Sequence, residues 1–491
     1  MTKAALAAFF ICSSAHALDR AALEKLASED NDDKIAAIGA LVAEADPKAA
    51  DVLRQAAEGE VELDGKKVEI VVNNRVRARI AEALSLLNLL SKDRTERLAA
   101  AKALAGGADP AMLPLILKAK EAEGDAQIKS LLEVTAAGMQ LKSEDKATRL
   151  AAVRALSLSN NKAILLEAAA DPDPDIKAEA QKTLRAIDER LVWGEWVGLA
   201  FAGVSLGSIL LLAALGLAIT YGLMGVINMA HGELIMIGAY TTYVVQGFFK
   251  GTSFFDWYLL AAIPASFAVA ALVGMALERS VIRWLYGRPL ETLLATWGSS
   301  LVLIQAVRTI FGAQNVQVEN PAFMSGGIEV LTNVVLPWSR VWIVVFAALV
   351  LFLMYLLLSK TRLGLFIRGV TQNRDMAACV GVPTARIDTW AFGLGSGIAG
   401  LAGCALSQLG NVGPDLGQAY IVDSFLVVVF GGVGQLAGTV YAALTLGFAN
   451  KLLESWSGAV LAKIALLVFI IIFIQRRPQG LFALKGRAVE A

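Results

Sequence analysis

The order of apolar and polar positions divides the chain into two unlike parts near residue 191. Before that point, apolar residues recur every three or four positions among charged ones, as at Leu150, Val153 and Leu156, which is typical of amphipathic helices. After it, long apolar runs follow one another, and a helix needs about 20 such residues to cross a membrane. The pattern predicts an all-α protein in which a soluble helical part precedes a polytopic membrane part.

About nine membrane segments are expected in the second part. Apolar runs lie at 197–221, 227–248, 257–277, 290–311, 341–358, 387–409 and 460–474, with one longer run at 421–456. The longer run exceeds the roughly 20 residues of one crossing, and the glycines between 431 and 438 divide it into two segments. A re-entrant half-helix at 421–430 is the alternative, but it would place the C-terminal arginines on the outer side.

Charged residues give these segments an orientation. Residues 1–190 hold 27 Lys and Arg against 31 Asp and Glu, whereas residues 191–491 hold 17 against 13. Of those 17 cations, 12 lie at 279–288, 360–386 and 476–487. Because loops rich in Lys and Arg remain in the cytoplasm, these three segments mark the inner face. The soluble part then lies outside the inner membrane, which requires an odd number of crossings.

The first residues resemble a secretory signal peptide. Lys3 is followed by a short apolar stretch at 4–12 and by Ala15-His16-Ala17, an A-x-A cleavage site. A retained anchor is the alternative, but the apolar stretch is short for a membrane crossing. The predicted domains are a signal peptide at 1–17, a periplasmic domain at 18–190 and a transmembrane domain at 191–491.

A motif occurs three times in the soluble part, beginning at Ser28, Ser91 and Ser143. Its form is S-x-D-x-x-x-[KR]-[LI]-A-A-x-x-A-L, in which Ser or Asp can cap a helix and apolar residues follow at helical spacing. Helix pairs that cannot bury their apolar faces alone stack into a solenoid, so a HEAT-like helical repeat is expected. Its exposed face is either a docking surface for an extracytoplasmic partner or a rigid cap without one.

Asn228, His231 and Glu233 lie close together inside an apolar segment. Ionisable side chains at membrane depth are costly and are retained mainly where they have a function. Their alternative role is structural, since polar groups near a helix start satisfy free backbone N–H groups and neighbouring helices.

Several functional classes find no support in the sequence. The chain contains no G-x-x-x-x-G-K-[ST] motif for ATP. Only one histidine follows residue 17, and no Cys and His cluster suggests a metal site. No basic tract suggests nucleic acid. The sequence therefore predicts a protein that is not an enzyme and has no cofactor.

Four motifs resemble those of the permease subunits of ABC importers for branched-chain amino acids and urea. They are Tyr221–Leu234, Thr361–Pro383, Phe430–Gly434 (FGGVG) and Arg477–Phe482 (RPQGLF). Three further stretches, 226–230, 294–298 and 311–318, resemble the urea permease B subunit, as does a long secreted domain ahead of the permease. The resemblance implies a bacterial inner-membrane subunit that works with a second permease subunit, two ATPase subunits and a periplasmic substrate-binding protein.

Urea is the cargo that this resemblance favours, and neutral hydroxyl and amide groups can match its donors and acceptor. Candidates for the substrate path are Thr220, Asn228, His231, Glu233, Thr296, Ser299, Ser300 and Gln305. Permeases for unlike solutes share the motif that holds Asn228, His231 and Glu233, so a structural or gating role is favoured for these three. The glycines at 393, 395, 397, 400 and 403 are expected to serve close helix packing.

The segment 360–386 is expected to couple the permease to its ATPase. Leu363, Phe366, Ile367 and Val370 fall at helical spacing, which indicates a short amphipathic helix. In the family, such a helix sits in a cleft of the ATPase, so Phe366 and Ile367 are the expected anchors. The residues assigned to this coupling loop are Arg362, Gly364, Phe366, Ile367, Arg368, Gln372, Asn373, Met376, Gly381 and Pro383.

Two alternatives to a urea permease remain open. The first is a permease subunit of the same kind of ABC importer, with branched-chain amino acids as its cargo. The second is a membrane receptor whose helical outer domain senses a ligand, although a receptor has no use for an ATPase-docking helix.

Overall fold

The computed structural model describes residues 20–482 apart from 29, 44–46, 64–65, 71, 90, 106–111, 159–161, 226 and 332–333. The chain forms two compact units, Met1–Leu191 and Val192–Ala491. Helices dominate the described part of both units, which confirms the all-α fold class. The expected signal peptide at 1–17 lies outside the described residues.

The first unit is a series of short helices with one small hairpin. Its elements are α1 (Arg20–Leu26), α2 (Asn31–Ala43), α3 (Pro47–Ala57), β1 (Glu60–Leu63), β2 (Lys66–Glu69), α4 (Asn74–Asn88), α5 (Arg94–Ala105), α6 (Leu113–Ala122), α7 (Ala126–Gln140), α8 (Lys146–Ala155), η2 (Leu156–Leu158), α9 (Lys162–Ala168) and the first part of α10 (Pro174–Met224). The antiparallel hairpin of β1 and β2 interrupts the helical order. Neighbouring helices share apolar clusters, one around Leu41 and Leu104 and one around Leu156 and Ile187.

The three copies of the sequence motif begin α2, α5 and α8 with the same capping geometry. Asp30, Asp93 and Asp145 occupy the same motif position, and each carboxylate accepts a backbone N–H from two residues later at 3.0, 2.9 and 3.3 Å. This bond satisfies an N–H group that the first helical turn leaves free. The motif therefore specifies where each of these helices starts.

The basic motif position connects one copy to the next segment. Arg97 donates to the carbonyls of Ser91 and Lys92 and pairs with Glu123 at 2.9 Å. Arg149 makes the equivalent bonds in the third copy and pairs with Asp171 at 3.1 Å.

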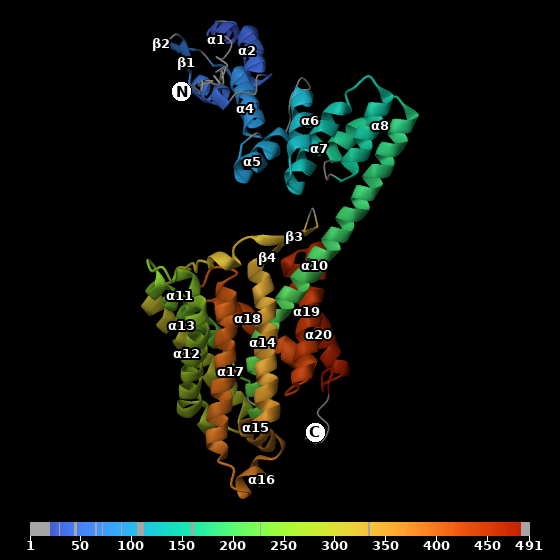
Figure 1. The fold of residues 1–491 in the computed structure, drawn as a ribbon. Coiled ribbons are helices and arrows are strands. Elements are labelled where there is room, and N and C mark those ends of the chain that lie inside the picture. The colour runs from blue at the N-terminus through green and yellow to red at the C-terminus, as the bar shows by residue number, and fades with distance from the viewer. Residues whose placement is uncertain are drawn as a thin grey trace, which may run out of the picture. The chain divides into compact units, whose positions relative to one another are not determined.

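The second unit is a bundle of long helices (Figure 1). After α10 come α11 (His231–Phe249), η3 (Phe255–Trp257), α12 (Tyr258–Ser280), η4 (Ile282–Leu285), α13 (Pro289–Phe311), η5 (Ala322–Met324), β3 (Gly327–Leu331), β4 (Val334–Pro337), α14 (Trp338–Lys360), α15 (Arg362–Gln372), α16 (Arg374–Cys379), α17 (Thr384–Ser407), α18 (Leu416–Gly431), α19 (Leu436–Ser457) and α20 (Ala459–Arg476). Figure 1 shows the antiparallel β3–β4 hairpin at one end of the bundle and α15 and α16 at the opposite end.

A helix covers each expected membrane segment. Within the described residues, seven helices are long and apolar enough to span a membrane: α10, α12, α13, α14, α17, α19 and α20. The segment at 421–456 is indeed two helices, but α18 has 16 residues and is shorter than a usual span. The break lies at 432–435, where Gly432 and Gly434 have φ of 101° and 79°, and Gly438 falls inside α19.

Helix α17 is buried along most of its length between α11 and α12. A Cβ on Gly238 of α11 would lie 2.1 Å from the carbonyl oxygen of Gly400 in α17, so these two backbones touch. On the α12 side, a Cβ on Gly274 would lie 2.4 Å from the Cβ of Ser396. Small residues permit such approach between helices in a membrane, which confirms the packing role predicted for the glycines of α17.

Two of the sequence motifs lie against each other. The N–H groups of Leu481 and Phe482 donate to the carbonyls of Phe430 and Gly431 at 2.9 and 3.2 Å. The Phe482 ring stacks on Tyr441 of α19, with ring centroids 5.6 Å apart. The C-terminal RPQGLF motif therefore closes over the glycine turn between α18 and α19.

We expect Arg97→Ala to lower the urea midpoint of the first unit, because it removes bonds to a charged group and leaves the Glu123 carboxylate, whose side chain is 6% exposed, without its partner. Residues 18–190, expressed alone, should be soluble and helical, and urea unfolding followed by circular dichroism measures the change. Arg54→Ala is the control, because the Arg54–Asp51 pair is exposed on both sides and such pairs contribute about 0–1 kcal/mol. Equal losses in the two variants would contradict the role given to Arg97.

The same pair predicts a pH dependence. The hydrogen bond from Arg97 lowers the pKa of the Glu123 carboxyl below its ordinary value of 4.5. A lowered pKa contributes stability above the ordinary value, and this contribution is lost as the pH falls through the pKa of the folded state. The difference in unfolding midpoint between wild type and Arg97→Ala should therefore be largest above about pH 5 and shrink toward pH 3. A difference that grows on acidification would be inconsistent with this pair.

Candidate functional site

A buried polar cluster lies where α11 begins. Asn228, His231 and Glu233 are each at most 2% exposed. The Asn228 side-chain oxygen accepts the N–H of Ala230 at 3.0 Å, so Asn228 shapes the turn that leads into α11. The His231 Nε2 lies 2.9 Å from the carbonyl oxygen of Ala213 in α10. Since a carbonyl only accepts, Nε2 donates and Nδ1 of a neutral ring is left as an acceptor.

Helix α13 contributes two hydroxyls to this cluster. Ser300 donates to Glu233 Oε1 at 2.7 Å. The Thr296 hydroxyl accepts the backbone N–H of Met229 at 3.2 Å and donates to the carbonyl of Thr292. The structure therefore brings five of the candidate path residues together, namely Asn228, His231, Glu233, Thr296 and Ser300.

Each of the three side chains around the start of α11 keeps one polar atom without a partner. In the described part of the chain, these atoms are Asn228 Nδ2, His231 Nδ1 and Glu233 Oε2. Buried polar atoms are nearly always hydrogen-bonded, so three such atoms in one motif require an explanation. Together they offer an amide donor, a ring acceptor and a carboxyl oxygen to a group that enters this region.

The other candidate path residues do not join the cluster. The Thr220 hydroxyl bonds the carbonyls of Gly216 and Leu217 within α10. Ser299 bonds the carbonyl of Ala295 within α13 at 2.8 Å and is only partly buried. Gln305 is exposed on α13. Helical spacing explains the difference, because Ser299 and Gln305 lie on other faces of α13 than Thr296 and Ser300.

The expected coupling loop forms two short helices with side-chain caps. Thr361 accepts the N–H of Gly364 at 3.2 Å at the start of α15, and Asn373 accepts the N–H of Met376 at 3.0 Å at the start of α16. Gly381 has a φ of 90°, and Pro383 precedes the first residue of α17. These residues determine where the loop turns.

The apolar face of α15, which was expected to anchor in the ATPase, packs against the chain itself. Ile367 is 6% exposed and packs with Val370, Ala377 and Ile387 of the same chain, and Phe366 lies at the edge of this cluster. An amphipathic pattern shows that one face is covered, but not by which partner. The exposed apolar side chains of the loop are instead Leu365, Met376 and Val380. Arg362, Arg368, Gln372 and Asn373 are also exposed.

A charged network that was not predicted from the sequence lies at the same end of the bundle. Glu278 at the end of α12 is fully buried and accepts bonds from Thr389 at 2.7 Å and Arg283 at 3.3 Å. Asp388 of α17 is also fully buried and forms a two-bond ion pair with Arg374 of α16. The available signal was an acidic residue at the end of one apolar run, Glu278, and another at the start of a later run, Asp388.

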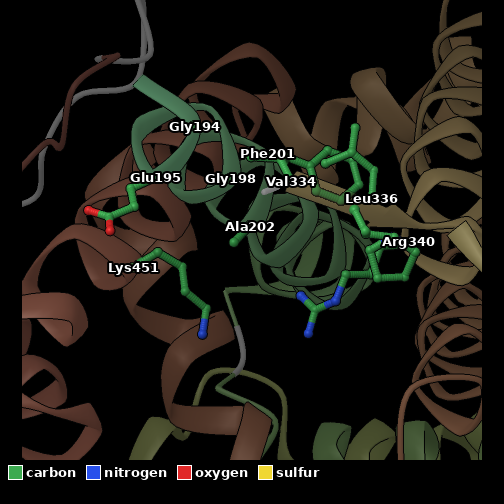
Figure 2. A pocket seen from close by; sticks show the side chains of 11 residues that line it. Gly194, Glu195, Gly198, Phe201, Ala202, Val334, Leu336, Arg340 and Lys451 are labelled. Atoms are coloured by element: carbon green, nitrogen blue, oxygen red, sulfur yellow. The ribbon is translucent and has the colours of Figure 1, made fainter. Parts of the chain in front are cut away.

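A cavity of about 320 Å³ opens at the β4 end of the second unit. Figure 2 shows the nitrogens of Arg340 and Lys451 facing this space from two sides, whereas the Glu195 carboxylate turns away from it. Phe201 and Leu336 supply apolar parts of the lining. Lys451 is already paired with Glu454 at 2.7 Å, so the Arg340 side of the cavity, beside apolar surface, is the part that suits a ligand with an anionic group.

Comparisons with known proteins give the family. Residues 199–475 match the family described as branched-chain amino acid transport system / permease component. The chain is 29% identical to the high-affinity branched-chain amino acid transport system permease protein BraD of Pseudomonas aeruginosa, over 57% of this chain and 93% of that protein.

A second relative is the high-affinity permease protein LivH of Escherichia coli, 28% identical over the same shares of the two chains. The autoinducer 2 import system permease protein LsrD of Yersinia enterocolitica is 27% identical, over 39% of this chain and 59% of its own. No solved structure matches the chain. The family match includes the polar cluster, the coupling loop and the glycine turn, and the chain belongs to the family of branched-chain amino acid transport system permease components.

Proposed function

We propose that the chain is a multi-pass permease subunit of an ABC importer in the bacterial inner membrane, with branched-chain amino acids as its cargo. The family match over residues 199–475 is the observation that carries this proposal. The chain has no P-loop of its own, so separate ATPase subunits supply the energy. A second permease subunit completes the path, membrane lipid surrounds it, and a periplasmic substrate-binding protein delivers the solute.

Two observations bear on the cargo. The relatives BraD and LivH are named for branched-chain amino acids. The cavity beside Arg340 suits a cargo with a carboxylate better than an uncharged one.

Urea is the second candidate. The alignment with BraD covers 93% of that protein but 57% of this chain, so the first unit is an addition that BraD lacks. A long domain ahead of the permease is one of the features that resemble the urea permease B subunit. The hydroxyls of Thr296 and Ser300 also suit an uncharged solute with several N–H donors.

The polar cluster is proposed to gate the path. In this structure its side chains are sealed from solvent, and their unpartnered atoms lie where α10, α11 and α13 meet. Separation of α13 from α11 would break the Ser300–Glu233 bond and expose a polar surface to the passing solute. A closed cluster is therefore the resting state of the gate.

The first unit is proposed to be a HEAT-like solenoid on the periplasmic side. Its three motif copies start helices in the same way, and Arg97 and Arg149 connect the second and third copies to the segments that follow them. Repeats that touch only their neighbours form such solenoids, whose exposed faces commonly bind other proteins.

Uptake by the purified importer separates the two cargoes. Proteoliposomes that hold the full complex should accumulate labelled leucine when ATP is supplied, and excess unlabelled valine should compete whereas urea should not. Accumulation of urea without leucine would replace the proposed cargo with the second candidate. Uptake of neither solute would contradict both.

Ser300→Ala should reduce net uptake by about tenfold, because a buried carboxyl oxygen loses its donor at a cost of about 1–3 kcal/mol, and a gate that closes poorly lets imported solute flow back. Ser299→Ala is the matched control on the next residue, since its hydroxyl bonds only its own helix. The solute accumulated at steady state, at equal amounts of inserted protein, measures both. Equal accumulation by the two variants would remove Ser300 from the gate.

Leu365→Ala combined with Val380→Ala should weaken the hold on the ATPase while leaving the permease folded, since both side chains are exposed. Loss of a large apolar anchor at an interface costs about 2 kcal/mol or more. Ile367→Ala should instead lower the thermal stability of the permease, because that side chain packs inside the chain. ATPase co-purification and melting temperature together separate the two effects, and the reverse pattern would restore Ile367 as the anchor.

A further inference from the structure

The ion pair between Arg374 and Asp388 occupies an unusual position in the second unit. Arg374 belongs to α16, in the loop expected to meet the ATPase, whereas Asp388 lies in the second turn of α17. Both carboxylate oxygens of Asp388 accept from the Arg374 guanidinium. The Asp388 side chain is 0% exposed and that of Arg374 is 41% exposed. One partner is thus fixed in the bundle and the other reaches the surface.

Neighbouring groups hold the pair in place. The Arg374 guanidinium lies over the ring of Tyr286, 4.8 Å from its centroid, and this contact with an aromatic face favours the cation. One residue after Asp388, the Thr389 hydroxyl donates to Glu278 of α12. Arg283, beyond the end of α12, bonds both Glu278 and the Thr389 hydroxyl at 3.3 and 3.0 Å. These bonds connect α16, α17 and α12 by polar groups within one region.

We propose that the Arg374–Asp388 pair is the mechanical link through which the ATPase-facing loop moves α17, with Glu278, Arg283 and Thr389 carrying the movement to α12. This inference rests on the proposed function, because it needs an ATPase that moves α16. Arg374 and Asp388 are positioning residues, since neither lies in the polar cluster around α11.

The physical reason is the cost of separating the pair. If α16 moved away alone, Asp388 would be left as an uncompensated buried charge, which is strongly unfavourable. Apolar contacts such as that of Ile367 with Ile387 are not directional and can slide. A two-bond pair between a planar guanidinium and a carboxylate fixes both distance and orientation. Displacement of α16 is therefore transmitted to α17 instead of being absorbed at the contact.

The glycine contacts of α17 extend the mechanical link from Asp388 to α11. Gly400 touches Gly238 of α11, and a Cβ on Gly403 would lie 1.9 Å from the carbonyl of Ile235. Helices in such contact move as one block, because no flexible side chain separates their backbones. Helix α11 begins at His231, next to the unpartnered polar atoms. The link at Asp388 thus reaches the proposed gate through two helices.

Neutralising variants in the full importer complex test the proposal. Arg374→Gln and Asp388→Asn each break the pair and leave one charge unmatched, whereas the double variant Arg374→Gln/Asp388→Asn removes both charges and keeps the apolar contacts. Replacing both partners of a buried interaction is far less destabilising than removing one. The double variant should therefore have a higher melting temperature than either single variant, but it should not regain the coupling of ATP hydrolysis to solute import.

The quantity to measure is solute imported per ATP hydrolysed, beside ATPase co-purification. We expect the double variant to retain the ATPase and its hydrolysis but to import about tenfold less solute per ATP, within the range typical of coupling between sites. Arg374→Lys, which keeps the charge, should restore part of the solute imported per ATP. Arg288→Ala is the matched control at this end of the bundle, because its pair with Glu291 is exposed on both sides, and it should leave the ratio unchanged.

Each other outcome has a definite meaning. A double variant that couples as well as wild type would overturn the link and leave the pair a structural feature only. Loss of ATPase co-purification in the double variant would also overturn it, because Arg374 would then belong to the docking surface. A wild-type complex that imports neither leucine nor urea would instead refute the proposed function on which the link depends.

Discussion

Close contact between α17 and its neighbouring helices is the constraint on which the second unit depends. Lipid is as apolar as a leucine side chain, so helices in a membrane gain little from hydrophobic burial and associate through close fit. Gly238 with Gly400, and Gly274 with Ser396, supply that fit. Because the contacts leave no room for a Cβ, α11, α12 and α17 hold one register, and this register fixes the positions of both polar regions.

The two polar regions differ in how completely their groups are paired. At the α16 end, both oxygens of Asp388 and those of Glu278 have partners, so the cost of burying their charges is offset. At the start of α11, Asn228, His231 and Glu233 each bond once and leave one polar atom unmatched. Fully paired groups hold a structure together, whereas unmatched ones favour a second state in which they find partners. The first region is suited to transmit movement and the second to respond to it.

Sequence reasoning located features that depend on local pattern. Helix positions follow from hydropathy runs, the starts of α2, α5 and α8 from the recurring Asp, and the packing face of α17 from its glycines. It did not foresee that Ile367 packs inward, because an amphipathic pattern looks the same whether a helix covers its own chain or a partner. The pairing of Arg374 with Asp388 was also missed, since a turn and a helix start lie between them and spacing does not give the geometry there. Gln305 was placed in the path by its polarity, although helical spacing turns it to the exposed face.

Cargo selection and gating need not reside in the same residues. The family match includes the polar cluster, and a relative named for autoinducer 2 import also aligns with this chain. A gate that serves unlike solutes must act through groups that any polar solute can replace, which describes unmatched hydroxyl, amide and ring atoms. Selectivity then requires a site that distinguishes charge and shape before the gate. The cavity lined by Arg340 and Phe201 has both a cationic and an apolar part, which are the two properties that such a site would need.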